Sequence, residues 1–319
     1  MKKFFIAIVA LAAAVACSND DIISIDRQAI GFGNPFVENS VRATDYSVPA
    51  NLTQFAVYGT VTGTAGTVNI FAGVPVTGAV GADWSYEEKY NQYWIPGADY
   101  NFAAVVDATV SAPDTTKGMP VTLTTTADNN GNLNDMLYAT ATVDNATANQ
   151  GVVNFNFSHL LSKVHFTVIS NAQGGYSHTV TGIKVSNFES GTYTIDGGTW
   201  AGTTAKNVEF ANIENVTVDN TNGVSNTSLL LVPNADTFKV EFTVNLYKKG
   251  TNNTTTLLST ITYADNDADT TNNAISVDTP LVKGNSYNFT INCEVGALID
   301  FSVGSLGGWD EKTPSIPIP

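Results

Sequence analysis

Residues that could perform catalysis or bind a metal are few in this sequence. Its three histidines are His159, His165 and His178. His159 and His165 are six residues apart, so on one continuous strand their side chains would share a face. No cysteine or cluster of acidic residues stands near them to complete a zinc site. A nucleophile elbow, a P-loop and a dinucleotide-binding fingerprint are also absent from the sequence, which therefore predicts neither an enzyme nor a bound cofactor.

One acidic stretch has part of a calcium-binding pattern. Asp265, Asp267 and Asp269 have the spacing of the first three ligands of an EF-hand loop. Thr270 and Ser276 stand where that loop needs a glycine and a glutamate. A polar turn explains the stretch better than a metal site does.

Aromatic residues gather between positions 84 and 94 and could bind a sugar. Trp84, Tyr93 and Trp94, with two further tyrosines, would offer flat faces on which a sugar ring can stack. Buried residues on strands that flank a loop are the more common cause of such a cluster. The sequence is compatible with both interpretations.

The chemistry that the sequence does support is attachment of lipid to Cys17. Two lysines precede an apolar stretch, residues 4–16, which is too short to span a bilayer but fits the centre of a secretory signal peptide. Ala14-Val15-Ala16-Cys17 resembles a bacterial lipobox, whose cysteine is lipidated and becomes the new N-terminus. We therefore expect a signal peptide over residues 1–16; an ordinary signal with an incidental cysteine is the alternative. The acidic residues 18–21 that follow resemble an export signal to the outer face of the outer membrane, or form a plain solvated tether.

If Cys17 carries lipid, Cys293 has no disulfide partner in the chain. It lies in a segment, residues 286–295, whose apolar residues alternate with polar ones as in a half-buried strand. A free cysteine behaves as a small hydrophobic residue, so we predict that Cys293 lies in the core.

The elements around these residues are predicted to be β-strands. Residues 238–246 alternate strictly between apolar and polar side chains, which is the pattern of a half-buried antiparallel strand. Similar short runs recur along the chain, and clusters of Gly, Asn, Asp and Thr separate them and indicate turns. The biased stretch 59–68 is best explained as a hairpin. The sequence therefore predicts an all-β fold of sandwich type, and 319 residues leave room for two domains.

The charge of the chain excludes one class of partner. The net charge is −15, and loss of residues 1–16 lowers it to −17 because two lysines and no acid are removed. Nucleic acid needs a basic face, so it is not an expected partner. No polybasic patch is present to bind anionic lipid, which leaves the acyl chains on Cys17 as the membrane attachment.

Five short motifs follow the signal peptide in order. They are an aromatic-Trp-x-Pro turn leading into a strand (residues 90–107), Asp-hydrophobic-hydrophobic-x-Ala (134–143), Phe-x-x-His-x-Leu-Ser-Lys (155–168), Leu-x-x-Gly-x-x-Tyr (281–291) and a closing Trp-Asp (309–310). In type, order and separation these motifs resemble the fimbrillin family of Bacteroidetes. Residues 39–59 also resemble the entry to the N-terminal domain of that family.

The resemblance implies a fold and a domain organisation. It implies two transthyretin-like β-sandwich domains in tandem, in a structural subunit of a cell-surface fimbria that has no catalytic activity. We expect a lipidated pro-segment with the first strand at 17–42, an N-terminal sandwich at 43–156, and a C-terminal sandwich with a terminal tail at 157–319.

The resemblance also implies processing and strand exchange. In that family an Arg-specific protease removes the N-terminal segment with one strand, and the open groove accepts a strand from a neighbouring subunit. Arg42 lies in a polar stretch that suits an accessible linker and matches the family's processing site, so we predict cleavage between Arg42 and Ala43. Residues 21–33 are apolar enough to supply the strand that is lost.

The C-terminal tail is the candidate donor strand. Ile316 and Ile318 would point to one face, and Pro317 and Pro319 lack N–H groups. We therefore predict that the tail pairs well along one side only.

The implied partners are other fimbrial subunits, in a homopolymer or heteropolymer, the outer membrane through lipid, and ligands on host or bacterial surfaces. The implied location is the outer membrane for the lipoprotein precursor and then the cell-surface fimbria. Two alternatives stay open: a monomeric surface lipoprotein that binds glycans through Trp84, Tyr93 and Trp94, and a fimbrial tip adhesin.

Overall fold

The computed structural model describes residues 28–37, 52–79, 82–111, 118–127, 132–172, 174–251, 254–264, 274–294, 300–304 and 310–311. Within these ranges the regular structure is β-strand, apart from short 3-10 segments such as η1 (Glu88–Tyr90). The all-β prediction is therefore confirmed. No helix that could span a membrane occurs among the described residues.

The N-terminal half forms a mostly antiparallel sheet. Its six strands lie in the order β2 (Phe36–Val37), β10 (Asn156–His159), β8 (Leu137–Val143), β5 (Asp99–Val106), β3 (Gln54–Gly63) and β4 (Gly66–Thr77). The exception to antiparallel pairing in this sheet is β2, which runs parallel to β10. A separate parallel pair joins β1 (Gly31–Phe32) to β9 (Val152–Val153). The predicted hairpin at 59–68 is confirmed, because β3 and β4 meet there through a two-residue turn that ends at Gly66, with φ of +109°.

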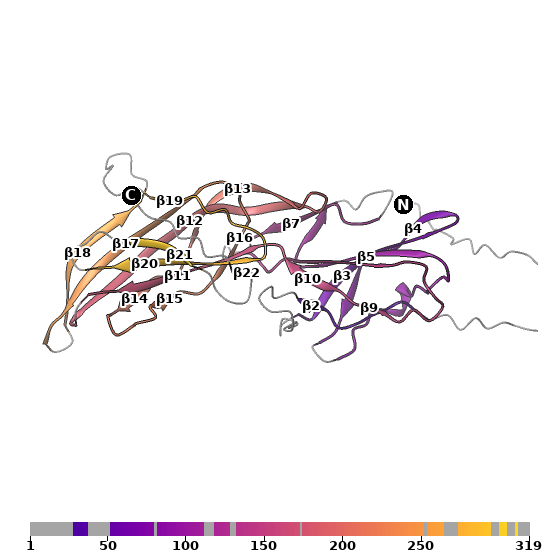
Figure 1. The fold of residues 1–319 in the computed structure, drawn as a ribbon, viewed down its shortest axis with the longest axis horizontal. Helices are drawn as coiled ribbons and strands as arrows, with labels where there is room; N and C mark the ends of the chain where they lie inside the picture. Colours follow the sequence, from indigo (N-terminus) through magenta and orange to yellow (C-terminus); the bar gives the residue numbers. More distant parts are fainter. Residues whose placement is uncertain are drawn as a thin grey trace, which may run out of the picture.

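The C-terminal half contains two sheets. The first is built around β11 (Ser162–Ser170) and β20 (Asn285–Cys293), with smaller strands β15 (Val224–Ser225), β16 (Leu229–Leu231), β21 (Asp300–Gly304) and β22 (Asp310–Glu311). The second follows the order β18 (Thr255–Tyr263), β17 (Phe238–Lys249), β12 (Tyr176–Thr194), β7 (Thr122–Thr126) and β6 (Thr109–Ser111), with β13 (Thr199–Glu209), β14 (Ile213–Val216) and β19 (Ile275–Val277) attached. Figure 1 shows the two halves end to end along the long axis, with β7 beside β12 near the middle.

Alternation of apolar and polar residues explains why these segments are strands. In β17 the side chains of Phe238, Val240, Phe242 and Val244 are buried while the intervening ones are not, as the sequence pattern predicts. These residues belong to the hydrophobic core of the C-terminal half, and a separate core lies in the N-terminal half. A third, smaller cluster includes Val105, Leu160 and Tyr193 and lies between the two.

Strand pairing crosses the boundary that we expect between residues 156 and 157. Strand β10 continues to His159 within the N-terminal sheet, and β6 and β7 join the C-terminal sheet although they precede that boundary in the sequence. Strand β10 then ends, and Leu160 and Leu161 connect it to β11. His159 and His165 therefore lie on different strands in different sheets, so the premise of one continuous strand is wrong.

Candidate functional site

The feature of the N-terminal half that bears on function is the segment 28–37, which we call the leader strand. It contains β1 and β2 and runs parallel to β9 and β10. The side chains of Ile30, Phe32, Pro35 and Val37 are buried, whereas Phe36 is 36% exposed. One face of the leader strand therefore completes the N-terminal core, although the segment precedes the first long strand of that half.

Backbone hydrogen bonds hold one edge of the leader strand against β9 and β10. The Gln28 N–H donates to the Ala148 carbonyl at 3.4 Å. Further along, the Gly33 N–H donates to the Val153 carbonyl and the Phe36 N–H donates to the Phe155 carbonyl, both at 2.9 Å. Without the leader strand, these buried or half-buried carbonyl groups would lose their donors.

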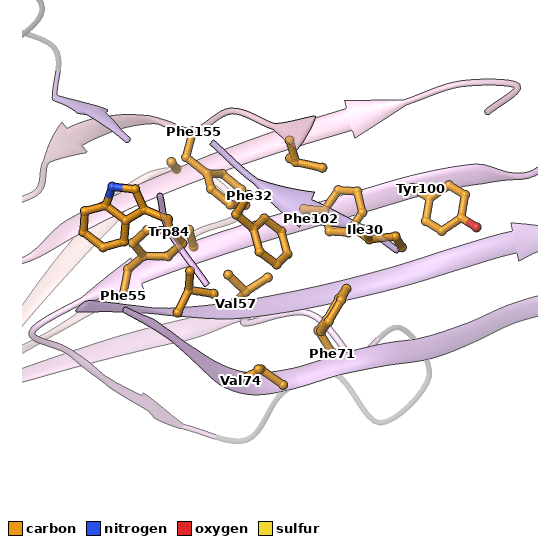
Figure 2. Close-up of a cluster of buried hydrophobic side chains, with 14 of the residues drawn as sticks. Ile30, Phe32, Phe55, Val57, Phe71, Val74, Trp84, Tyr100, Phe102 and Phe155 are labelled. Atoms are coloured by element: carbon orange, nitrogen blue, oxygen red, sulfur yellow. The ribbon is translucent and has the colours of Figure 1, made fainter. Parts of the chain in front are cut away.

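Phe32 is the centre of the packing in this region. Its ring centroid lies 5.5 Å from that of Phe71, 5.6 Å from Tyr86, 5.8 Å from Phe155 and 6.2 Å from Phe102. Figure 2 shows the Phe32 ring inside the cluster, with aromatic rings from the strands of the domain around it. The leader strand thus supplies the residue around which the N-terminal core is arranged.

The second edge of the leader strand meets residues 84–94. The Ile30 N–H donates to the Gln92 carbonyl at 2.8 Å, and the Trp94 N–H donates to the Gln28 carbonyl at 3.3 Å. The Tyr86 hydroxyl donates to the Ile30 carbonyl at 2.5 Å, and burial raises the pKa of that hydroxyl, which keeps it protonated as a donor. The leader strand is therefore bonded on both of its edges.

The aromatic residues considered for sugar stacking lie in this segment, residues 84–94, which forms a second wall beside the leader strand. Trp84 is 6% exposed and Trp94 is 0% exposed, while Tyr93 is 47% exposed. The structure brings the three together around the leader strand, but it buries both indole rings, and of the three only Tyr93 presents much of its surface to solvent. With the leader strand in place, the two tryptophans act as core residues.

Several predicted sites lie outside the described residues. They are the lipidation site Cys17, the processing site Arg42–Ala43, the donor-strand candidates Ile316 and Ile318, and the acidic stretch 265–270. Val37 is the last described residue before Arg42. The leader strand therefore lies on the N-terminal side of the predicted cut, and the rest of the domain lies on the other side.

The histidines and Cys293 lie in surroundings that suit a structural role. The His159 Nδ1 lies 2.9 Å from an Asp135 carboxylate oxygen. The His178 Nδ1 lies 2.9 Å from the Ser170 hydroxyl. Cys293 is free and fully buried, as its strand pattern predicts, and burial raises the pKa of its thiol to about 12. Among the described residues, no three potential ligands gather as a metal site would require.

Comparison with known proteins identifies the family. A model of fimbrillin-like proteins matches residues 41–305. The chain belongs to the fimbrillin-like family. No curated protein matches the sequence.

Two solved structures of similar fold come from the genus Bacteroides. A fimbrial protein from Bacteroides vulgatus superimposes with a TM-score of 0.63 at 18% identity, covering 88% of this chain and 99% of the other. A candidate cell adhesion protein from Bacteroides ovatus superimposes with a TM-score of 0.53 at 14% identity, covering 90% of this chain and 99% of the other. At such identities the likeness concerns the fold of this fimbrillin-like chain.

Sequence reasoning missed both walls around the leader strand. No local pattern in the sequence of residues 148–157 or 84–94 indicates that these segments pair with the segment around residue 30, because the contacts join parts of the chain that are far apart in sequence. The one available signal was composition: the aromatic residues at 84–94 are apolar enough to form a buried wall. Pro35 and Val37, which extend the leader strand past Gly33, were also missed.

Proposed function

We propose that the chain is a structural subunit of a cell-surface fimbria that assembles by strand exchange and contributes to adhesion. In this proposal the precursor is exported as an outer-membrane lipoprotein acylated on Cys17, and a protease then cuts after Arg42. Membership of the fimbrillin-like family supports the fimbrial role. The similar folds of a fimbrial protein and a candidate cell adhesion protein are consistent with it.

The observation that carries the proposal is the position of the leader strand relative to Arg42. The leader strand supplies three buried side chains, those of Ile30, Phe32 and Val37, to a core whose other members all follow residue 51. A cut after Arg42 leaves the strand without a covalent link to that core. What was an internal strand then becomes a ligand that can dissociate.

The energy involved is large enough to hold subunits together. Burial of Ile30, Phe32 and Val37 contributes ~1.5–3 kcal/mol each, or roughly 4.5–9 kcal/mol in total, before the cost of ordering a strand. Loss of the leader strand exposes the apolar groove and the carbonyl groups of Val153 and Phe155. A strand from a second subunit that fills the groove restores both the apolar burial and the hydrogen bonds to these carbonyl groups.

The donor that we propose is the C-terminal tail of a neighbouring subunit, with Ile316 and Ile318 as the inserted side chains. A chain that lacks residues 315–319 should then be cleaved normally but should fail to polymerise. Normal polymerisation of the truncated chain would exclude the tail as donor and leave the rest of the proposal in place.

The test of the proposal uses the two arginines of the chain, Arg27 and Arg42. Digestion with an Arg-specific protease should give a fragment that begins at Ala43, identified by N-terminal sequencing, and a ladder of polymers on unheated denaturing gels. Arg42→Lys should keep the positive charge but remove the cut, and it should stay monomeric.

Arg27→Lys is the matched control, because a cut at residue 27 leaves the leader strand attached. That variant should assemble like the parent protein. Polymerisation of Arg42→Lys at the parent rate, or monomeric protein after complete cleavage at residue 42, would contradict the proposal.

A further inference from the structure

Residues 84–94, which we call the strap, cover the second edge of the leader strand. Isolated antiparallel bridges join Ala29 to Tyr93 and Phe32 to Trp84, in addition to the hydrogen bonds that the Gln92 carbonyl accepts and that Trp94 and Tyr86 donate. A strand at the edge of a sheet can leave sideways into solvent, but the leader strand has backbone partners on both sides. One wall has to move before it can leave.

We propose that the strap is a second pairing surface for whichever strand occupies this groove, and that it lifts each time one strand replaces another. The inference rests on the proposed strand exchange and names the part of the subunit that controls it. The opposite wall is less suited to move, because β9 leads after two residues into β10, which also pairs with β8 inside the sheet.

Two tryptophans anchor the strap, and both carry an unsatisfied group. The Trp84 ring lies 5.1 Å from that of Phe55, and the Trp94 ring lies 4.8 Å from that of Tyr100. The Nε1 atoms of both indoles are buried without a hydrogen-bond partner. A buried polar group without a partner is unusual and costs free energy. Lifting the strap gives both N–H groups access to water, which offsets part of the apolar burial that is lost.

The strap also fits the chemistry of the expected incoming strand. In the leader strand, the inward-facing residue Ile30 directs its N–H to the strap. In a tail that runs in the same direction with Ile316 and Ile318 inward, the isoleucine N–H groups face the strap, while Pro317 and Pro319 face β9 with no N–H to offer. A tail that can donate along one edge only thus faces the strap, where the Gln92 carbonyl accepts the Ile30 N–H of the leader strand. The partner is therefore an extended segment of a second subunit with an apolar residue and a free N–H where Ile30 lies.

A reversible lock on the strap tests the inference without touching the leader strand. Thr77 and Ser85 exchange both backbone hydrogen bonds, at 2.8 and 2.9 Å, and are exposed. Such a pair has Cα atoms about 5.5 Å apart, within the range of a disulfide. Thr77→Cys with Ser85→Cys, in a full chain that carries Cys17→Ser, should tie the start of the strap to β4. The control disulfide, Thr62→Cys with Thr67→Cys, lies at the far hairpin, where the two threonines pair across β3 and β4.

After Arg-specific cleavage, dissociation of the leader strand is measured by size-exclusion chromatography. Assembly is measured by the ladder of polymers on unheated denaturing gels. The oxidised strap variant should release its leader at least about tenfold more slowly than the reduced form, whereas the control disulfide should change nothing. Equal release from the oxidised and reduced strap variants would overturn the inference. If the cleaved parent protein releases its leader but forms no ladder, the proposed function fails, and the release rates still decide the role of the strap.

A second pair of variants tests the hydrogen bonds that the strap makes. Tyr86→Phe removes the hydroxyl that donates to Ile30, and Tyr90→Phe removes a hydroxyl from the other half-buried tyrosine of the strap. Loss of one such bond should speed leader release about 2- to 10-fold for Tyr86→Phe, with no change for Tyr90→Phe. Identical rates for the two variants would show that the strap does not hold the leader strand.

Discussion

Replacement of Phe32 by alanine should release the leader strand faster than any other single truncation in it. Phe32 is 3% exposed, and its ring contacts four other aromatic rings. Its removal leaves a cavity that those rings, fixed on long strands, can fill only in part. The N-terminal half is therefore expected to lose both stability in the uncut chain and affinity for the leader after cleavage.

The size of the effect follows from burial. Truncation of a buried phenylalanine costs about 3–5 kcal/mol. Since about 1.4 kcal/mol corresponds to a factor of ten, the cleaved leader should bind roughly 150- to 5,000-fold more weakly. Most of that change should be in the dissociation rate, because changes of affinity at one interface act mainly through dissociation.

Phe36→Ala is the matched control, because it removes the same side chain from the opposite face of the same segment, where Phe36 is 36% exposed. Its effect should be within about two- to threefold, as for most surface substitutions. Both variants would be cleaved after Arg42 and followed by size-exclusion chromatography as the leader leaves. Equal release from Phe32→Ala and Phe36→Ala would refute the idea that inward-facing side chains hold the leader strand.

Two further predictions concern buried titratable groups in the C-terminal half. Because burial raises the pKa of Cys293 to about 12, iodoacetamide at pH 8 should leave it unmodified in folded Cys17→Ser protein and alkylate it in denaturant, as read by mass spectrometry; rapid labelling of the native state would contradict its burial. Burial also lowers the pKa of His165 and of His178 below the ordinary 6.5, so the unfolded chain takes up protons first and stability is lost as the pH falls from about 6.5 toward the folded pKa values. The thermal midpoint should therefore drop between pH 7 and pH 5, and by less in a His165→Gln, His178→Gln variant; an equal drop in that variant would assign the acid sensitivity to other groups.

The elements of the fold could be predicted where burial follows a local pattern. The alternation of residues 238–246 specifies a strand and its inward face, and β17 has both. Cys293 is buried for the same reason, since it shares a face with Tyr287, Phe289 and Ile291 on β20. A period of two determines which side of a strand is apolar, and that information lies within a few residues.

Alternation does not determine which strands are neighbours. Strand β11 pairs in parallel with β20, more than a hundred residues later, and β6 and β7 leave their own half to join β12. Such contacts depend on matching surfaces that are assembled only when the chain folds, so neither segment carries a local mark of its partner. The strap is the same case: its aromatic residues predicted burial or ligand binding, but the sequence could not say that residues 28–32 are what they cover.

The position of the leader strand explains why a single cut could separate a stored subunit from a polymerising one. Before cleavage, the leader strand is covalently linked to the rest of its domain, and a covalently linked segment competes at an effective concentration on the order of 1 mM. A donor strand on another subunit, at a concentration of about 1 μM, competes at a disadvantage of roughly a thousandfold, or about 4 kcal/mol, even if it fits the groove equally well. In the proposed function, cleavage after Arg42 would remove that advantage and would leave in place, until the strand dissociates, the contacts of Ile30, Phe32 and Val37, which are buried in the uncut chain. In the proposed mechanism, the groove and the strap would then set the rate at which the strand leaves. The protease would decide whether exchange is possible, and residues 84–94 would decide how fast it proceeds.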